Sequence, residues 1–135
     1  MRLQLTRRGD YAIRAMLLLA GAPDDYQSGT EIARQTGIPE RLVTQVMGQL
    51  VRAGLIRARL GRHGGYMLSG PASDIAILAI VEAVEGDARR SRCVLSGAQC
   101  DADQRCQVHD IFAAAQEALI GRLANASLAA AVRAA

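Results

Sequence analysis

The stretch GIPERLVTQVMGQLVRAGLIRARLGRHGGYMLSGP, residues 37–71, holds a helix pattern followed at once by a hairpin pattern. In its first half apolar residues recur every three or four positions, which predicts an amphipathic helix with Pro39 in its first turn. The predicted buried face consists of Leu42, Val43, Val46, Met47, Leu50 and Val51. In the second half two short runs, 55–60 and 66–69, flank a Gly-Arg-His-Gly-Gly tip. This arrangement indicates a β-hairpin with a flexible loop.

Two further helices are predicted before this stretch. Residues 6–20 have apolar side chains at roughly helical spacing and a charged start, which predicts a first helix. The apolar positions are Tyr11, Ile13, Met16, Leu17 and Ala20. The motif Ser-Gly-Thr-Glu has the spacing of a capping box, in which the Ser28 hydroxyl caps a helix and Glu31 reaches back. We therefore expect a short second helix, Thr30 to Thr36, ending at Gly37.

The second half of the chain is predicted to be helical on both sides of a cysteine-rich loop. Residues 72–85 predict a helix capped by Ser73 or Asp74 and ended by Gly86. The cysteine segment should be a loop through about Asp101, with a helix from Asp103 onward. An apolar stripe on this later helix comprises Val108, Ile111, Phe112, Ala115, Leu119 and Leu123, with Ala118 beside it. Asn125 or Ser127 should start a short final helix.

Composition limits the kind of protein this can be. At 135 residues the chain suits one compact domain, or a small domain with an arm. Half of the residues are hydrophobic but only 3% are aromatic, so the core must be aliphatic. We find no run of about 18 apolar residues and no signal-peptide pattern. We therefore expect a cytoplasmic protein without a membrane partner.

The first half of the chain carries the positive charge. Residues 1–65 contain ten arginines and five acidic residues, whereas residues 66–135 contain six arginines and eight acidic residues. An anionic partner would therefore be drawn to the first half. Exposed arginines are also common on solvated surfaces that bind nothing, so the charge alone does not establish a partner.

Two helices joined by a tight turn and followed by a hairpin describe a winged helix-turn-helix. In that architecture the second helix enters the major groove of DNA with its N-terminal residues at the base edges. The candidates for base contacts are Arg41, Thr44 and Gln45. The hairpin tip, with Arg59, Arg62 and His63, would lie over the backbone or in the minor groove. The candidates for phosphate contacts are Arg2, Arg7, Arg8 and Arg57. A helix-turn-helix pattern can also be purely structural.

All three cysteines and one of the two histidines lie within residues 93–109. Cys106 and His109 are three residues apart, which on the first turn of a helix puts them on one face. Cys93 and Cys100 could fold back over that face to complete four ligands. Soft thiolates with an imidazole suit an iron-sulfur cluster or zinc, and three thiols could also form a redox switch. Zinc is less favoured, because no pair has the close spacing of a zinc knuckle. A Cys-His enzyme is not favoured, since no third orienting group is evident.

At three places the chain resembles the Rrf-two-type transcriptional regulators. The likeness runs from Met1 to about Ala130 and rests on MRLQLTRRGDYAIRAMLLLA, on GLIRARLGRHGGYMLSGPASDIAILAIVEAVEG and on C-x6-C-x5-C-x2-H-x2-F. The first cysteine spacing is one residue longer than is common in the family. The resemblance implies a homodimer, joined through the long helix after the cysteines, that binds two-fold symmetric double-stranded DNA operators. Members are usually repressors and sometimes activators.

The resemblance also implies that Cys93, Cys100 and Cys106 bind an iron-sulfur cluster. In the IscR-like branch a histidine three residues after the last cysteine completes a 2Fe-2S site, and His109 matches it. In the NsrR-like branch an aspartate of the partner subunit completes a 4Fe-4S site, and Asp10 matches that one. His109 is favoured, because carboxylates are hard ligands and the imidazole lies nearby in sequence.

The fold expected overall is mainly α, a winged helix-turn-helix domain plus a long dimerisation helix. The domains expected are a DNA-binding domain over 1–86, a cluster-binding loop over 87–106, and a dimerisation helix with C-terminal tail over 107–135. The function expected is a DNA-binding regulator, which the resemblance implies is a repressor, whose cluster senses redox state, nitric oxide or iron-sulfur status. The alternatives are a thiol-based redox regulator without a cluster and a zinc-stabilised interaction module.

Overall fold

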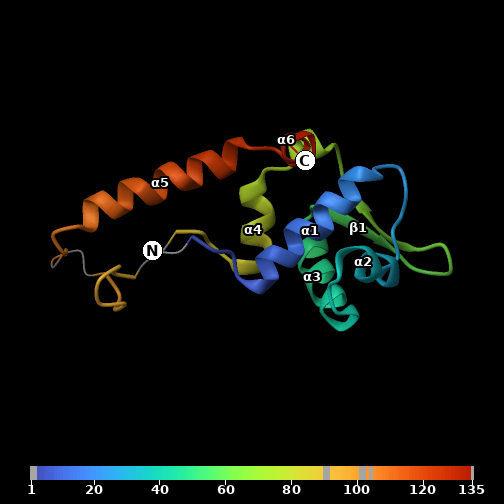
Figure 1. Cartoon of the computed structure of the whole chain (residues 1–135), viewed down its shortest axis with the longest axis horizontal. Helices are drawn as coiled ribbons and strands as arrows, with labels where there is room; N and C mark the ends of the chain where they lie inside the picture. Colours follow the sequence, from blue (N-terminus) through green and yellow to red (C-terminus); the bar gives the residue numbers. More distant parts are fainter. Residues whose placement is uncertain (1–2, 90–91, 101–102, 104, 135) are drawn as a thin grey trace.

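The computed structural model describes residues 3–89, 92–100, 103 and 105–134 (Figure 1). The helices are α1 (Arg7–Gly21), α2 (Gly29–Thr36), α3 (Glu40–Arg52), α4 (Ile77–Glu85), α5 (His109–Asn125) and α6 (Leu128–Arg133). Between α3 and α4 lie the strands β1 (Ile56–Arg59) and β2 (Gly65–Leu68) and a short 3-10 helix (Ala72–Asp74). This order confirms the predicted mainly α, winged helix-turn-helix fold.

Side-chain caps begin three of the helices. The Thr6 hydroxyl accepts from the Gly9 N–H at 3.2 Å, and the Ser28 hydroxyl accepts from the Glu31 N–H at 3.1 Å. The Ser127 hydroxyl accepts from the Ala130 N–H at 3.1 Å, as predicted for the last helix. The capping box at Ser28 is only half formed, because the Glu31 carboxylate bonds to Arg34 and Gln35 instead of reaching back.

The wing is an antiparallel hairpin tied to the segment before α2. Its register pairs Ile56 with Leu68 and Arg59 with Gly65. The backbones of Gln27 and Tyr66 exchange two hydrogen bonds, of 2.9 and 2.8 Å, so the α1–α2 connection lies along the outer edge of β2. Gly65 has a φ of 144°, and a Cβ there would overlap the Gln27 backbone. Glycine at this position therefore permits the close approach that anchors the wing.

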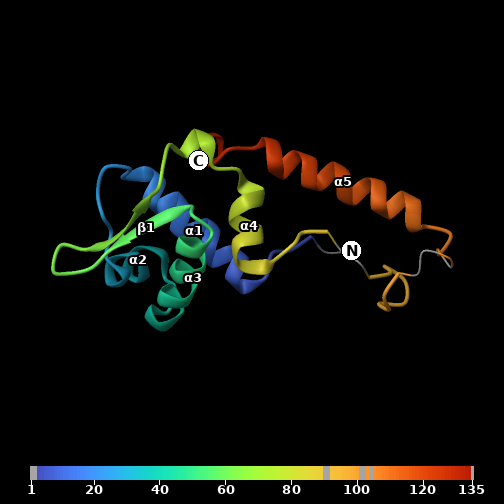
Figure 2. The same cartoon turned by 180° about the vertical axis from the view of Figure 1, so that it is seen from behind.

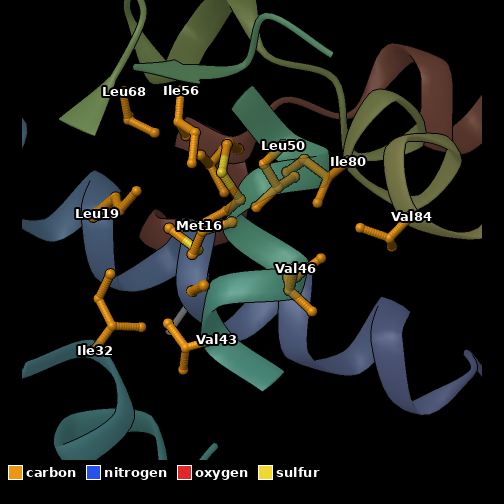
Figure 3. Close-up of a cluster of buried hydrophobic side chains, with 14 of the residues drawn as sticks. Met16, Leu19, Ile32, Val43, Val46, Leu50, Ile56, Leu68, Ile80 and Val84 are labelled. Carbon is orange, nitrogen blue, oxygen red and sulfur yellow. The ribbon is translucent and has the colours of Figure 1, made fainter. Parts of the chain in front are cut away.

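The core lies where α1, α3, α4 and the wing meet (Figure 3). From α3 the buried residues are Val43, Val46, Met47 and Leu50, while Leu42 and Val51 of the predicted face are only half-buried. From α1 the buried residues are Gly9, Ala12, Ala15, Met16 and Leu19. The predicted first helix is therefore confirmed; of its apolar positions Met16 is fully buried, while Tyr11, Ile13, Leu17 and Ala20 are half-buried and pack against this core. The small Ala12 and Ala15 share this buried face with the larger Met16 and Leu19.

The C-terminal helix α6 returns to this core. Leu128 is fully buried, its N–H donates to the Ile75 carbonyl at 2.8 Å, and the Ile77 N–H donates to the Ala126 carbonyl at 2.9 Å. Helix α5 connects the cysteine segment to α6 and projects from the body of the molecule on the side away from the wing (Figures 1 and 2). The structure describes every residue of α5, and Ile120 is the one that is buried.

Two predicted helix starts were wrong. Neither Ser73 nor Asp74 is the N-cap of α4; both lie in the 3-10 helix, and Ala76 is the N-cap residue. The first N–H of α4, that of Ile77, is satisfied by the Ala126 carbonyl, so a contact distant in sequence takes the place of the cap. Helix α5 begins at His109 rather than Asp103, because Cys106 to Val108 form a turn instead, in which the His109 N–H donates to the Cys106 carbonyl at 3.0 Å.

Candidate functional site

The outer face of α3 presents the three side chains predicted to contact bases. Arg41, Thr44 and Gln45 are all exposed, whereas Val43, Val46 and Met47 anchor the opposite face in the core. The entry to α3 is fixed by the Thr30 hydroxyl, which donates to the Glu40 carboxylate at 2.8 Å. The helix-turn-helix therefore holds a polar face of α3 outward in a defined orientation.

The wing presents the predicted backbone or minor-groove contacts. Arg57, Arg62 and His63 are exposed. Arg59 is exposed as well, but its guanidinium donates to the His63 carbonyl at 2.7 Å and lies 4.0 Å from the centroid of the Tyr26 ring. Arg59 therefore braces the wing tip, a role that its sequence position did not indicate. Tyr26 was missed by sequence reasoning, because its partner comes from a distant segment.

The start of α1 carries the predicted phosphate contacts. Arg7 and Arg8 are exposed in the first turn, and Arg2 lies outside the described residues. Asp10, the alternative fourth ligand, pairs with Arg14 at 2.9 Å. Glu85, which sequence reasoning did not single out, accepts from the Thr6 N–H at 2.5 Å. The end of α4 is thereby attached to the residue that caps α1.

The other candidate site is a cavity of about 50 Å³ at the start of α5. Its lining comprises Arg92, Cys93, Val94, Cys100, Cys106, His109, Phe112, Ala113 and Gln116. The three cysteines are half-buried free thiols. The structure thus brings together Cys93, Cys100, Cys106 and His109, while Asp10 is not among the lining residues of this chain.

Hydrogen bonds hold the cysteine segment in shape. The Cys93 N–H donates to the Ala98 carbonyl at 2.8 Å, and the Gly97 N–H donates to the Cys93 carbonyl at 2.9 Å, which closes a small loop. Before this loop, Arg89 pairs with Glu117 of α5 at 3.0 Å. Cys93 therefore lies on a compact turn, and the residues before this turn are attached to α5 through Arg89.

The thiols differ in acidity because their surroundings differ. The pKa of Cys93 is lowered to about 7, first by hydrogen bonds from the backbone N–H groups of Ser96 and Leu95 and then by the Ser96 hydroxyl. The pKa of Cys100 is raised, first by burial and then by the neighbouring Cys93 and Cys106. Cys93 is therefore a substantial fraction thiolate at neutral pH, the form that binds metals and reacts with oxidants.

The donor set suits a soft metal centre, although its geometry is loose. Three thiols and an imidazole are the ligands that iron-sulfur clusters and zinc prefer. Among the residues that the structure describes, no three Cys, His, Asp or Glu side chains are grouped closely enough to hold a metal ion. The residues present fit such a group chemically, because all four line one cavity.

Residues 5–134 match Rrf2, a family described as iron-dependent transcriptional regulators. The chain belongs to the Rrf2 family. It is 32% identical to the HTH-type transcriptional regulator IscR of Serratia proteamaculans (strain 568) over 129 residues, 94% of this chain and 77% of that one. It is also 32% identical to Protein aau3 of Rhizobium meliloti (strain 1021) over 95 residues, 70% of this chain and 62% of that protein's length.

Solved structures share this fold over nearly the whole chain. CymR of B. subtilis, titled the global cysteine regulator, has a TM-score of 0.84 at 21% identity and covers 99% of each chain. T. potens IscR has a TM-score of 0.76 at 22% identity, over 97% of this chain and 87% of that one. The Rrf2 family consists of transcriptional regulators and not of enzymes. In the described part of the chain no helix is long and apolar enough to cross a membrane.

Proposed function

We propose that this Rrf2-family protein is a homodimeric DNA-binding repressor whose operator affinity depends on an iron-sulfur cluster held by Cys93, Cys100, Cys106 and His109. The observation that carries this proposal is the single cavity that these four side chains line at the start of α5. In this scheme residues 1–86 read DNA, residues 87–106 bind the cluster, and residues 107–135 provide the dimer helix and the tail.

In the proposed repressor, the exposed face of α3 contacts the DNA bases. Arg41 can bond bidentately to guanine and Gln45 to adenine, while Thr44 offers one hydrogen bond or a methyl contact. The wing residues Arg62 and His63 would reach the backbone or the minor groove beside it. Phosphate contacts are assigned to Arg2, Arg7, Arg8 and Arg57, and Arg59 supports the wing that carries the others.

The exposed apolar face of α5 supports dimerisation through this helix. Ile111 is 68% exposed, Phe112 37% and Leu119 36%, all on a helix that projects from the body of the molecule. The nearby Ala115 and Ala118 are exposed and small enough for a second helix to approach closely. Joining two copies here would set the spacing of the two α3 helices, and hence the spacing of the operator half-sites.

Two features of the cavity support cluster binding. Cys93 is partly ionised at neutral pH, and His109 lies on the same cavity as all three thiols. When bound, the cluster would supply one-electron redox chemistry at a centre sensitive to oxidants and nitric oxide. His109 as the fourth ligand corresponds to a 2Fe-2S site. The alternative is Asp10 of a partner subunit with a 4Fe-4S site, for which Asp10 would have to leave Arg14.

The contacts on both sides of the cysteine segment support coupling to DNA binding. Arg89 attaches the segment to Glu117 of α5, and Glu85 attaches the end of α4 to Thr6 at the start of α1. Loss of the cluster would loosen residues 93–106 and so alter both the dimer helix and the winged domain. A coupling of about 1 to 3 kcal/mol, typical of allosteric systems, changes affinity roughly 5- to 150-fold.

The test is an anaerobic absorbance spectrum with iron and sulfide counted per monomer, for wild type, His109→Ala and Asp10→Ala. A visible spectrum with two irons that is lost in His109→Ala supports the proposed site. Four irons lost in Asp10→Ala would move the fourth ligand to the partner subunit. A colourless protein contradicts the cluster, and equal operator affinity of holo and apo protein contradicts the switch.

A second function is favoured by the lowered pKa of Cys93 beside two other thiols. Without a cluster, Cys93 could attack a peroxide and then pair with Cys100 or Cys106. Two thiols would lose two protons and two electrons to form one S–S bond, and the peroxide would be reduced. Iron-free protein that gains a disulfide and changes operator affinity on peroxide treatment would identify this alternative.

A further inference from the structure

The wing ends in an exposed leucine. Leu60 is the first residue after β1, and its side chain is 96% exposed, the highest value among the exposed large hydrophobic residues of the described chain. Single exposed leucines are common on proteins, so the exposure by itself indicates nothing. The shape and charge of the surrounding tip are what distinguish Leu60.

The tip that carries Leu60 is braced. Arg59, the preceding residue, donates to the His63 carbonyl at 2.7 Å across the tip and stacks on Tyr26. The Gly64 N–H donates to the Gly61 carbonyl at 3.0 Å. A Cβ on Gly64 would overlap the backbone carbonyl of Arg59, so only glycine fits this tight turn. The flexible loop expected from the glycines is therefore a turn of defined shape.

The base of the wing is anchored as well. The two backbone hydrogen bonds between Gln27 and Tyr66 join the hairpin to the α1–α2 connection. Leu60 therefore lies at the tip of a wing that is ordered before any partner binds. A pre-ordered element loses less conformational entropy on binding, so more of the binding free energy is available to deform the partner.

The charges around Leu60 select an anionic partner. Arg57, Arg59, Arg62 and His63 lie on the same hairpin, and no acidic residue occurs between Leu55 and Pro71 in the sequence. An apolar tip within a cationic surround matches the minor groove, whose walls are sugar edges flanked by phosphates. The nearby exposed face of α3 favours duplex DNA as that partner.

We infer that Leu60 is a wedge that enters the minor groove of the operator and partly unstacks one base step, which bends the duplex. The inference rests on the proposed function, since it assigns a role within the same DNA complex. Leucine is among the apolar side chains that can open a base step in this way. Pyrimidine–purine steps unstack most easily, so the operator should favour such a step under the wing.

The test uses the full-length protein in its DNA-binding form and an operator selected with wild type from random duplexes. Affinity, its salt dependence and the bend between labelled DNA ends are measured for wild type, Leu60→Ala and Leu60→Met. Val132→Ala is the matched control, because Val132 is an exposed aliphatic residue on α6, outside both the wing and the cysteine segment. Arg62→Ala is the control for a lost cation.

Leu60→Ala is expected to bind about ten-fold more weakly, to bend the operator less and to lose the preference for the flexible step, with an unchanged salt slope. Leu60→Met should keep the bend, Val132→Ala should match wild type, and Arg62→Ala should reduce the salt slope while keeping the bend. Leu60→Ala with the wild-type bend, at any affinity, would overturn the wedge. If wild type selects no duplex sequence, the proposed function fails and the wedge fails with it.

Discussion

The exposed Arg59 and the half-buried Glu31 are charged residues that serve the local structure. Arg59 makes one hydrogen bond to the His63 carbonyl and one stacking contact with Tyr26, so it shapes the tip instead of pointing freely into solvent. The Glu31 carboxylate accepts from Arg34 at 2.6 Å and from Gln35, which ties together one face of α2. Residue type alone predicts a solvated charge at both positions, whereas the partner determines the role.

Glu31 should make the stability of the protein depend on pH. Its pKa is lowered from 4.5 to about 2, first by the hydrogen bond from Arg34 and then by that from Gln35. Because the folded pKa is depressed, the contribution is present above about pH 4.5 and is lost as the pH falls toward 2. The melting temperature of wild type should therefore exceed that of Glu31→Gln most at pH 6, and the two should converge near pH 2.

The control for this prediction is Arg34→Ala. In that background Glu31→Gln should have a much smaller effect at pH 6, because the main partner of the carboxylate is gone. A difference between Glu31→Gln and wild type that stays constant from pH 6 to pH 2 would contradict the assigned cause.

Helix α3 has a glycine on its exposed side, which makes the helix less stable than alanine at the same position would. Gly48 lies in the middle of α3, on the side that carries Arg41 and Gln45. A Cβ at this position would meet only Arg52 Nη1, at 3.7 Å, which is ordinary contact. Packing within the described chain therefore does not require glycine here. Because glycine has no side chain, a partner such as DNA can approach the backbone of α3 closely at this position.

Gly48→Ala should stabilise the free protein and weaken operator binding. Alanine in a helix interior is favoured over glycine by about 0.8 to 1 kcal/mol, so the free energy of unfolding should rise by up to that amount. The added methyl group would lie between α3 and the DNA in the proposed complex. Urea unfolding and operator titration of the same samples test both effects, and a variant with raised stability and unchanged affinity would remove Gly48 from the DNA-contacting face.

Helix α6 is short, yet it contributes to the core of the winged domain. Leu128 is fully buried, and residues at both ends of the α5–α6 turn bond to Ile75 and Ile77, around the start of α4. Leu128→Ala should lower the free energy of unfolding by about 2 to 5 kcal/mol, the usual range for a buried leucine. Denaturant unfolding measures this, with Val132→Ala on the same helix as the control, because Val132 is 36% exposed and should change little.

At the scale of the whole molecule, α5 projects from a packed winged body, and the start of α5, next to the cysteine segment, is the end that lies away from that body (Figure 1). The body contains the buried residues of α1 to α4 and α6, and α5 leaves it with a largely exposed surface (Figure 2). An apolar face on a projecting helix is what a second copy would cover in the proposed dimer. Covering it would also bring the two cysteine segments to defined positions beside the dimer helices.

Ile111→Arg should therefore yield monomers without unfolding the body. Ile111 is 68% exposed within one chain, so the substitution removes little intramolecular contact, while it places a charge in the proposed dimer seam. Sedimentation velocity measures the mass, and circular dichroism measures the fold. Ala130→Arg, at an exposed position of α6, is the control and should remain dimeric. A dimeric Ile111→Arg protein would contradict the α5 seam.

The sequence by itself determined the winged helix-turn-helix order, the exposed face of α3 and the caps at Ser28 and Ser127, because each depends on residues within a few positions of one another. It also placed the three cysteines and His109 in one segment. Only the tertiary structure decided that Ala126 caps α4, that Leu128 completes the core, that Tyr26 braces Arg59 and that Glu85 is attached to Thr6. Each of these contacts joins segments far apart in the chain, and local periodicity carries no information about which distant groups folding brings together.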